Sequence, residues 1–332
     1  MRCLLCCICV LAVVSCESTH QSRPCFEVKR ALGKETSLFS LCSDVSITPL
    51  DNIQNTNIAM DNLLLEVSNQ YFYLLDRSNN QVAVYDKNGA YVSLIKPSDT
   101  VIDISSYEDK YLDLLIGGGA LEYSADGSSL LHEFSFRDCG IELRSLARRD
   151  DNVLVLTGTS SGKAYDCEFF IDRNSYIEME SPVADEEDYF SGSFFRCEGT
   201  TYFYCSSDGE VSHYTNDDFI WTAHKWQFKE TVSSFSNVQK TSTNYYLQFT
   251  FDGDKNVLVF DESSGKYLVV QKTKEGVIFP LGVIHGNTNY YCCRSDQLYA
   301  LLSPDYLDEE GKTKYQESIV KESNVIISYS LR

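Results

Sequence analysis

One pattern of strands and turns repeats along the chain roughly every 40 to 45 residues, the length of a single repeat unit in several β-rich architectures. In its first clear copy, three apolar runs are separated by two polar turns: Tyr71–Leu75, Asp76–Asn80, Gln81–Tyr85, Asp86–Gly89 and Ala90–Ile95. Aromatic and β-branched runs joined by turns such as Asn-Gly are typical of antiparallel strands. A sheet of this size cannot bury both faces alone, so neighbouring units must cover each other.

Further copies of the pattern follow at Leu112–Phe136, Val153–Glu180, Thr201–Phe228, Tyr245–Gln271 and Thr288–Leu302. In the third of these copies, one strand is predicted over 219–228. The last copy is incomplete, and its strands are predicted over 288–293 and 297–302. This period is typical of β-propeller blades, which pack in a ring and expose only short edges. Two further strand-like segments, Val45–Leu50 and Asn324–Leu331, could share one blade. The sequence therefore predicts an all-β, six-bladed propeller of four-stranded antiparallel blades, closed by pairing of its N- and C-terminal strands. Seven blades and a pair of β-sandwiches are the alternatives.

The first sixteen residues, MRCLLCCICVLAVVSC, have the composition of an export signal. The apolar run after Arg2 is about 11 residues long, whereas a membrane-spanning helix needs about 20. Val13-Val14-Ser15-Cys16 resembles the bacterial lipobox, which implies cleavage before Cys16 and acylation of that cysteine. An ordinary secretory signal or an uncleaved anchor is the alternative, although polar residues directly after Cys16 disfavour the anchor. The resulting division is a lipoprotein signal peptide over 1–15, a lipid-anchored tether over 16–40 and one propeller domain over 41–332.

A second resemblance concerns the body of the chain. Ile47–Leu50, Tyr71–Ile95 and the terminal NVIISYSLR resemble six-bladed β-propeller lipoproteins of Bacteroidetes, which are similar in shape to TolB-like and NHL-like propellers. The resemblance implies a lipid-anchored protein of the bacterial cell envelope, with the outer membrane as the expected membrane and its occupied face left open. Many members carry a glycine- and proline-rich stretch after the first blade, whereas this chain has Lys96–Ile104 there.

The balance of charge excludes one class of partner. The 332-residue chain has 28 basic and 48 acidic residues, a formal net charge of −20. Such a charge repels nucleic acids, so no nucleic-acid partner is expected. At 43% hydrophobic residues the chain can bury a large core and is not disordered.

Motifs for cofactors and metals are incomplete. Gly158–Ala164 lacks one residue of phosphate-loop spacing and is predicted to be a hairpin loop. Asp252, Asp254 and Asn256 alternate as in a calcium loop, but the required glycine and glutamate are missing, which favours a polar turn. Asp185–Asp188 is interpreted as a solvated acidic loop, and the histidines lack metal-ligand spacing. We therefore expect neither a metal nor a cofactor.

The two tryptophans, Trp221 and Trp226, are the weak candidates for ligand contact, because aromatic faces can stack on sugars or ligand rings. Packing between blades is the favoured alternative for both. Eight of the 13 cysteines lie beyond residue 16, and free thiols are expected for them: Cys25, Cys42, Cys139, Cys167, Cys197, Cys205, Cys292 and Cys293. Cys197 and Cys205 flank a predicted hairpin and could pair across it, and adjacent Cys292 and Cys293 should point to opposite faces of a strand.

No catalytic residues can be selected from the sequence, because carboxylates are too numerous and no nucleophile motif is present. The prediction is a non-enzymatic binding or assembly module of the envelope that captures nutrients such as glycans or peptides, or joins an outer-membrane protein. The alternative is a hydrolase or lyase with carboxylates at the mouth of the channel.

Overall fold

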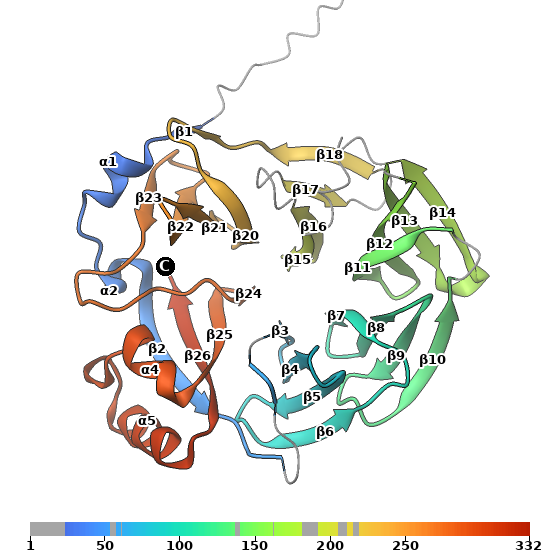
Figure 1. The fold of residues 1–332 in the computed structure, drawn as a ribbon, viewed down its shortest axis with the longest axis horizontal. Helices are drawn as coiled ribbons and strands as arrows, with labels where there is room; N and C mark the ends of the chain where they lie inside the picture. The colour runs from blue at the N-terminus through green and yellow to red at the C-terminus, as the bar shows by residue number, and fades with distance from the viewer. Residues whose placement is uncertain are drawn as a thin grey trace, which may run out of the picture.

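The structure is a computed structural model that describes residues 24–53, 58–60, 62–136, 140–161, 163–180, 192–204, 211–214 and 219–332. Its described residues form six four-stranded antiparallel sheets and one short parallel strand pair. The sheets follow one another around a ring, with one strand of each nearest the centre (Figure 1). The predicted all-β propeller of four-stranded antiparallel blades is confirmed.

We number the sheets as blades in the order in which they follow one another from β3. Blade 1 contains β3 (Leu63–Val67), β4 (Tyr71–Asp76), β5 (Gln81–Asp86) and β6 (Tyr91–Ile95). Blade 2 contains β7 (Val101–Tyr107), β8 (Tyr111–Ile116), β9 (Gly119–Ser124) and β10 (Leu130–Ser135). Blade 3 contains β11 (Glu142–Asp150), β12 (Val153–Ser160), β13 (Lys163–Phe170) and β14 (Ser175–Glu180).

Blade 4 contains β15 (Ser193–Cys197), β16 (Thr200–Tyr204), β17 (Val211–Tyr214) and β18 (Phe219–His224). Blade 5 contains β20 (Ser233–Lys240), β21 (Asn244–Phe251), β22 (Asp254–Asp261) and β23 (Tyr267–Val270). Blade 6 contains β24 (Val283–His285), β25 (Thr288–Arg294), β26 (Asn324–Leu331) and β2 (Cys42–Pro49). In every blade the inner strand comes first in this order.

β4 is apolar from Phe72 to Leu75 because neighbouring blades cover both of its faces. In β4, Phe72, Tyr73, Leu74 and Leu75 are each at most 1% exposed. The turn that follows β5 depends on Gly89, which has φ +86° and lies against blade 6. A Cβ atom at this position would come within 2.0 Å of the Pro49 carbonyl oxygen, so only glycine fits.

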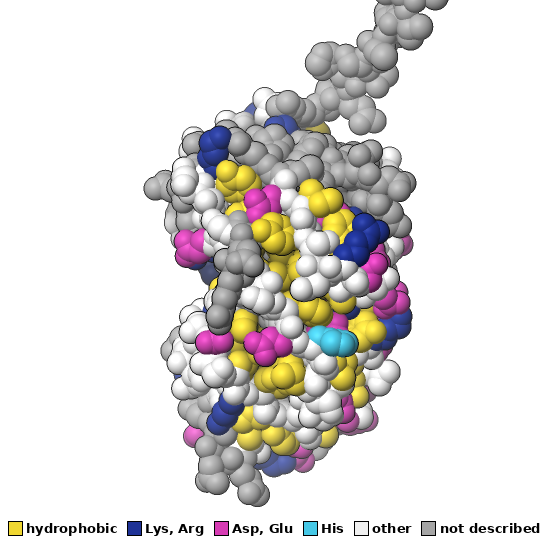
Figure 2. Space-filling view, turned by 90° about the vertical axis from the view of Figure 1, so that its right-hand side faces the viewer, with side chains coloured by type: hydrophobic (Ala, Val, Ile, Leu, Met, Phe, Trp, Pro, Cys, Tyr) yellow, Lys and Arg dark blue, Asp and Glu magenta, His cyan; other side chains and the backbone are white. Residues whose placement is uncertain are grey.

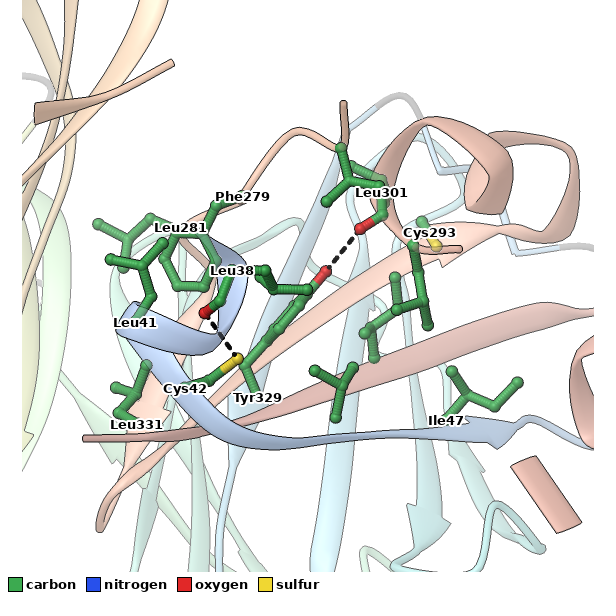
Figure 3. Packing of buried hydrophobic residues seen from close by; sticks show 14 of the residues in the cluster. Leu38, Leu41, Cys42, Ile47, Phe279, Leu281, Cys293, Leu301, Tyr329 and Leu331 are labelled. Carbon is green, nitrogen blue, oxygen red and sulfur yellow. Dashed lines mark hydrogen bonds between the residues drawn. The ribbon is translucent and has the colours of Figure 1, made fainter. Parts of the chain in front are cut away.

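The two ends of the propeller chain meet in blade 6. β2 pairs antiparallel with β26, from Cys42 opposite Leu331 to Pro49 opposite Val325. These are the strands predicted around Val45–Leu50 and Asn324–Leu331. Their shared core is shown in Figure 3, where the buried Tyr329 hydroxyl donates to the Leu301 carbonyl oxygen at 3.2 Å. The N-terminal strand thus completes a sheet whose other strands come from the C-terminal end.

The strand predicted over 297–302 is wrong. This segment forms η2 (Ser295–Gln297) and the short helix α4 (Leu298–Leu301), followed by η3 (Pro304–Tyr306) and α5 (Glu309–Lys321). Leu298 and Leu301 are both buried, and their spacing of three places them on one helix face. Asp308 caps α5 by accepting a hydrogen bond from the Gly311 amide at 2.7 Å.

The predicted tether over 16–40 extends too far, and residues 24–40 belong to the folded body. They contain β1 (Cys25–Phe26), α1 (Val28–Leu32) and the start of α2 (Leu38–Leu41). β1 pairs with β19 (Gln227–Phe228), and Phe26, Val28 and Leu38 are fully buried. Residues 1–23 lie outside the described residues. The single strand predicted over 219–228 is also wrong, because the strand is interrupted between β18 and β19.

The outer rim of the ring is chemically mixed. On the side shown in Figure 2, hydrophobic side chains lie among acidic, basic and other polar ones. The outer strands β10 and β14 leave Leu130 and Ile177 about half exposed. Among the described residues, no helix combines the length and the apolar character needed to cross a membrane.

Candidate ligand-binding channel

The inner strands of all the blades surround a central cavity of about 870 Å³. Strands β3, β7, β11, β15, β20 and β24 each contribute to its wall (Figure 1). A volume of this size is typical of sites for small molecules. Charged, amide and aromatic side chains share the lining, among them Glu66, Asp103, Arg196, Gln239, His285 and Tyr290.

Side chains on the inner strands bind each blade to the next. Glu66 Oε1 accepts from the Ser106 amide at 3.1 Å and from its hydroxyl at 2.8 Å, which joins blade 1 to blade 2. Asp103 Oδ2 accepts from the Leu146 amide at 3.0 Å, which joins blade 2 to blade 3. The Ser145 hydroxyl donates to the Gly192 carbonyl beside blade 4 at 3.3 Å.

The same kind of contact continues around the ring. Blade 4 is joined to blade 5 where the Tyr204 hydroxyl donates to the Ser236 carbonyl at 3.2 Å. Blade 5 is joined to blade 6 where Gln239 Oε1 accepts from the Ile284 amide at 3.1 Å. His285 Nε2 then lies 2.9 Å from Asn69 Oδ1, between blades 6 and 1. We call this circuit of contacts, from Glu66 to His285, the inner belt.

Two carboxylates of the inner belt have strongly shifted pKa values. Burial raises the pKa of Glu66 to about 7, and the hydrogen bonds from Ser106 only partly oppose this effect. Burial likewise raises the pKa of Asp103 to about 6 against the hydrogen bond from Leu146. Asp103 is buried and Glu66 is partly buried, and both line the cavity, where a charge is costly unless it is compensated.

One mouth of the channel carries a hydrogen-bonded chain of polar groups. Asn69 donates from Nδ2 to Asp109 Oδ2 at 2.9 Å, while Asp109 Oδ1 accepts from the Gln70 amide at 3.0 Å. Burial lowers the pKa of His285, the other partner of Asn69, so its neutral form is favoured. A carboxylate, an amide and a neutral imidazole therefore converge at this mouth.

Lys87 lies close to this mouth, between blades 1 and 6. Its Nζ is 4.1 Å from the Phe72 ring centroid and 4.4 Å from that of Tyr290, and it forms no hydrogen bond within the described residues. Burial lowers its pKa to about 8. The two rings provide cation–π stabilisation in place of hydrogen bonds. Lys87 therefore packs between blade 1, which contributes Phe72, and blade 6, which contributes Tyr290.

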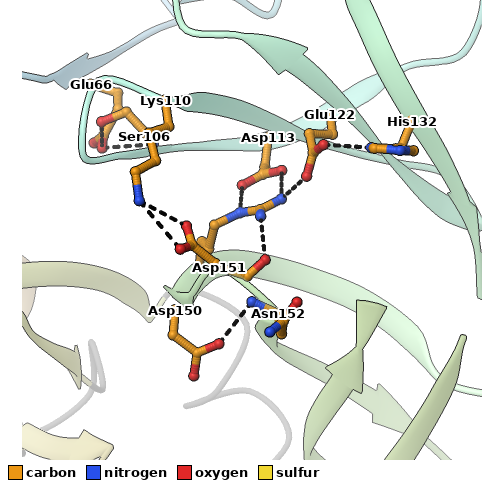
Figure 4. A network of polar contacts seen from close by, with 10 residues as sticks. Glu66, Ser106, Lys110, Asp113, Glu122, His132, Asp150, Asp151 and Asn152 are labelled. Atoms are coloured by element: carbon orange, nitrogen blue, oxygen red, sulfur yellow. Dashed lines mark hydrogen bonds and ion pairs between the residues drawn. The ribbon is translucent and has the colours of Figure 1, made fainter. Parts of the chain in front are cut away.

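A buried ion cluster joins blades 2 and 3 outside the channel (Figure 4). Arg148 donates from Nε and Nη2 to the two oxygens of Asp113, each at 2.7 Å, and also pairs with Glu122. These three side chains are at most 3% exposed. His132 Nδ1 lies 2.7 Å from the other oxygen of Glu122. Because its groups satisfy one another, this cluster is interpreted as structural.

The residues selected from the sequence lie elsewhere. Cys16, the predicted lipid attachment site, is outside the described residues. Trp221 belongs to β18, and Trp226 packs against the rings of Phe26, Tyr245 and Phe260, with centroids 6.0, 5.2 and 6.0 Å away. Trp226 does not line the cavity. Ligand contact by either residue stays a prediction.

The weak motifs fall in turns. β12 ends at Ser160 and β13 begins at Lys163, so the predicted hairpin at the phosphate-loop-like segment is confirmed. Asp252 lies in the tight turn between β21 and β22, and Asp254 and Asn256 follow at the start of β22, where the Asn256 side chain donates from Nδ2 to the Asp254 carbonyl at 2.8 Å. Asp185–Asp188 lies outside the described residues. Within the described ranges, no group of three or more potential ligands could hold a metal.

Thiols are free at Cys25, Cys42, Cys197, Cys292 and Cys293. Cys139 and Cys205 lie outside the described residues, so pairing of Cys197 with Cys205 stays a prediction. Cys292 lines the cavity, whereas Cys293 is buried in the core of blade 6. The predicted opposite orientation of these neighbours is confirmed.

Comparisons with known proteins support the architecture. No family model and no curated protein matches the sequence. A crystal structure of a Bacteroides fragilis protein described as exported is 13% identical, with a TM-score of 0.65 over 94% of this chain and 100% of that one. A member of the DUF4221 family from Bacteroides vulgatus is 9% identical, with a TM-score of 0.54 over 88% and 97% of the two chains. At these identities the likeness concerns the fold alone.

Proposed function

We propose that this chain is an exported, lipid-anchored, six-bladed propeller of the bacterial cell envelope that binds a ligand in its central channel without turning it over. The six sheets and the pairing of β2 with β26 support the blade count and the closure. The lipobox-like sequence ending at Cys16 supports the anchor. Glycans, peptides or an outer-membrane protein are the partners that such a module would serve.

The observation that carries the binding role is the cavity itself. It measures about 870 Å³; blade 3 contributes the apolar Leu146 and Ala147 to its wall, and each of the other blades contributes polar or aromatic side chains. Several of these groups, Glu66 and Gln239 among them, already hold the next blade. A rigid wall of this kind suits recognition, because little conformational freedom is lost when a ligand binds.

Binding can be tested by narrowing the channel. Purified protein is screened against oligosaccharides and short peptides by thermal shift, and each hit is repeated with Ser236→Trp, a residue of the cavity wall. We expect the variant to lose binding at least tenfold. Ser135→Trp, on the exposed face of the outer strand β10, is the matched control. Hits that survive Ser236→Trp unchanged would place binding outside the channel and contradict the proposal.

The anchor needs its own test. Expression of the full chain in a Bacteroides host should give a membrane-associated protein whose mass includes fatty acyl chains. Cys16→Ser should release it into the soluble fraction, because the acyl chains are lost. An unmodified wild-type mass would contradict lipidation while leaving the channel hypothesis intact.

A hydrolase or lyase is the second candidate. It is favoured by Glu66, Asp109 and His285, which all line the cavity, and by the raised pKa of Glu66, a property of general acids. Incubation of purified protein with the ligands found by thermal shift, followed by mass spectrometry, decides between the two candidates. Turnover that Glu66→Gln or His285→Asn abolishes would replace the non-enzymatic proposal.

A further inference from the structure

Two carboxylates of the channel wall lack a cationic partner. Glu66 of β3 and Asp103 of β7 line the cavity on adjacent inner strands, and Asp103 is only 6% exposed. Neither forms an ion pair with any described lysine, arginine or histidine. Buried carboxylates in proteins are normally paired or bound to a cation. In the same molecule, the buried carboxylates of Asp113 and Glu122 are paired with Arg148. The two channel carboxylates differ from them in having no such ion pair.

The hydrogen bonds of the inner belt use only part of each carboxylate. Ser106 occupies Oε1 of Glu66, and Leu146 occupies Oδ2 of Asp103. Oε2 of Glu66 accepts no hydrogen bond from the described residues. An ionised carboxylate offers about four acceptor positions. The acceptor capacity of Glu66 is therefore not exhausted, and the residue lines the cavity.

The arginines of the wall are engaged elsewhere. Arg196 stacks on the Tyr107 ring, with its guanidinium carbon 4.7 Å from the centroid, and donates to the Gly199 carbonyl at 3.4 Å. Arg77 donates to the Ile102 carbonyl at 2.9 Å. The charge of Arg196 lowers the pKa of Glu66, and the charge of Arg77 lowers that of Asp103, but neither effect outweighs burial. The lumen beside the two carboxylates remains favourable to a cation.

We propose that the channel binds an organic ligand whose primary ammonium group lies against Glu66 and Asp103. This inference rests on the proposed binding function and specifies the ligand class. An ammonium group has three donors to share between the two carboxylates, and aromatic residues of the wall such as Phe194 and Tyr204 offer contact surface for the rest of the molecule. A metal ion is disfavoured, because the described residues contain no group of three or more ligands able to hold one.

The test compares amines with their neutral counterparts. The probes are phenethylamine, tyramine, glucosamine and alanyl-phenylalanine, each beside its N-acetylated form, added to the purified full-length protein in mild detergent. Affinity is measured by ligand-observed NMR and calorimetry. We expect at least one amine to bind tenfold or more tightly than its N-acetylated form. The double variant Glu66→Gln/Asp103→Asn should remove that preference, since the amides keep the acceptor for the neighbouring blade but lose the charge.

Controls separate this inference from the proposed function. Glu133→Gln, on the exposed outer strand β10, should retain the preference for amines. If the double variant does not fold, Glu66→Gln alone is used and at least a threefold weakening is expected. Equal binding of amines and N-acetylated probes, blocked by Ser236→Trp, would overturn the ammonium proposal while channel binding stands. Failure of all eight probes, or calcium binding that the double variant abolishes, would also overturn it.

Discussion

At the scale of single residues, Arg148 shows how one buried charge joins two blades. It lies on β11, and both of its carboxylate partners, Asp113 and Glu122, lie on blade 2. Its Nη1 also donates to the Asp151 carbonyl at 3.2 Å, and its guanidinium carbon lies 4.4 Å from the Tyr111 ring centroid. Burial raises the pKa of Asp113 although Arg148 opposes this shift. The cluster is therefore sensitive to the loss of its only buried cation.

We expect Arg148→Met to lower the free energy of unfolding by about 3–5 kcal/mol, because it leaves the buried carboxylate of Asp113 without an ion-pair partner and leaves Glu122 with His132 alone. Denaturant titration measures this change. Arg173→Met is the control: Arg173 is 71% exposed and only 3.7 Å from Asp172, so its loss should cost about 1 kcal/mol or less. A loss below 1 kcal/mol for Arg148→Met would show that the cluster does not hold the blades together.

Glu66 and Asp103 should make stability depend on pH. Their pKa values are about 7 and about 6 in the folded protein, above the ordinary values of 4.5 and 3.8. Between about pH 4 and pH 7 the folded state therefore binds more protons than the unfolded state. Stability contributed by these groups is present at low pH and is lost as pH rises through this window.

The measurement is the melting temperature of wild type and Glu66→Gln from pH 4.5 to 8. The variant should lose less stability than wild type as pH rises, because the side-chain amide that it introduces cannot ionise. Asp103 keeps its own raised pKa in the variant, so some pH dependence should remain. Glu133→Gln should follow the wild-type curve. Parallel curves for wild type and Glu66→Gln would show that this carboxyl does not titrate as proposed.

At the scale of elements, the alternation of apolar runs with polar turns was sufficient to predict most strands. The three strands predicted over 71–95 coincide with β4, β5 and β6 within one residue at each end. Such runs are buried by neighbouring blades, so their local pattern and their tertiary environment agree. Helix α4 was missed because four residues are too few to show a helical period, and α5 was missed because it is mostly polar and carries little periodic apolar signal. α5 buries only Gly311, Tyr315 and Ser318.

The pairing of β2 with β26 brings Ile47 directly opposite Ile327, and these side chains are 2% and 0% exposed. We expect each Ile→Ala substitution to cost about 2–5 kcal/mol. The free energy of unfolding of the double variant should fall by about 0.5–2 kcal/mol less than the sum of the two single losses, because the two side chains share one environment. Denaturant titrations of the four proteins give this coupling. Ile177→Ala combined with Ile327→Ala should be additive, since Ile177 is 53% exposed on β14.

At the scale of the whole molecule, the ring could be predicted but the lining of its candidate channel could not. The repeat period indicated blades, and blades must close into a ring to cover their faces. The inner belt instead depends on which residue of each inner strand meets the next blade. Ser106 and Glu66 are 40 residues apart, and His285 and Asn69 are 216 apart. No local motif marks such partners, and Trp226, chosen for its chemistry alone, does not line the cavity.

The N-terminal segment ties blades together in a way that a tether would not. Phe26 is fully buried, and the ring centroids of Trp226, Phe228, Phe260 and Tyr267 lie 5.0–6.0 Å from its own. The Val28 and Lys29 amides further along this segment donate to the Glu230 carboxylate at 2.9 and 3.2 Å. Residues 24–41 thus belong to the folded body of the propeller.

Phe26→Ala should therefore lower the free energy of unfolding by about 3–5 kcal/mol, the usual cost of emptying a buried aromatic site. Phe39→Ala is the matched control, because Phe39 is 37% exposed in the same segment and should cost much less. Both are measured by denaturant titration of the full chain. If Phe26→Ala were as mild as Phe39→Ala, residues 24–41 would be dispensable for folding. The lipid-attached tether would then reach to β2, as the sequence alone predicts.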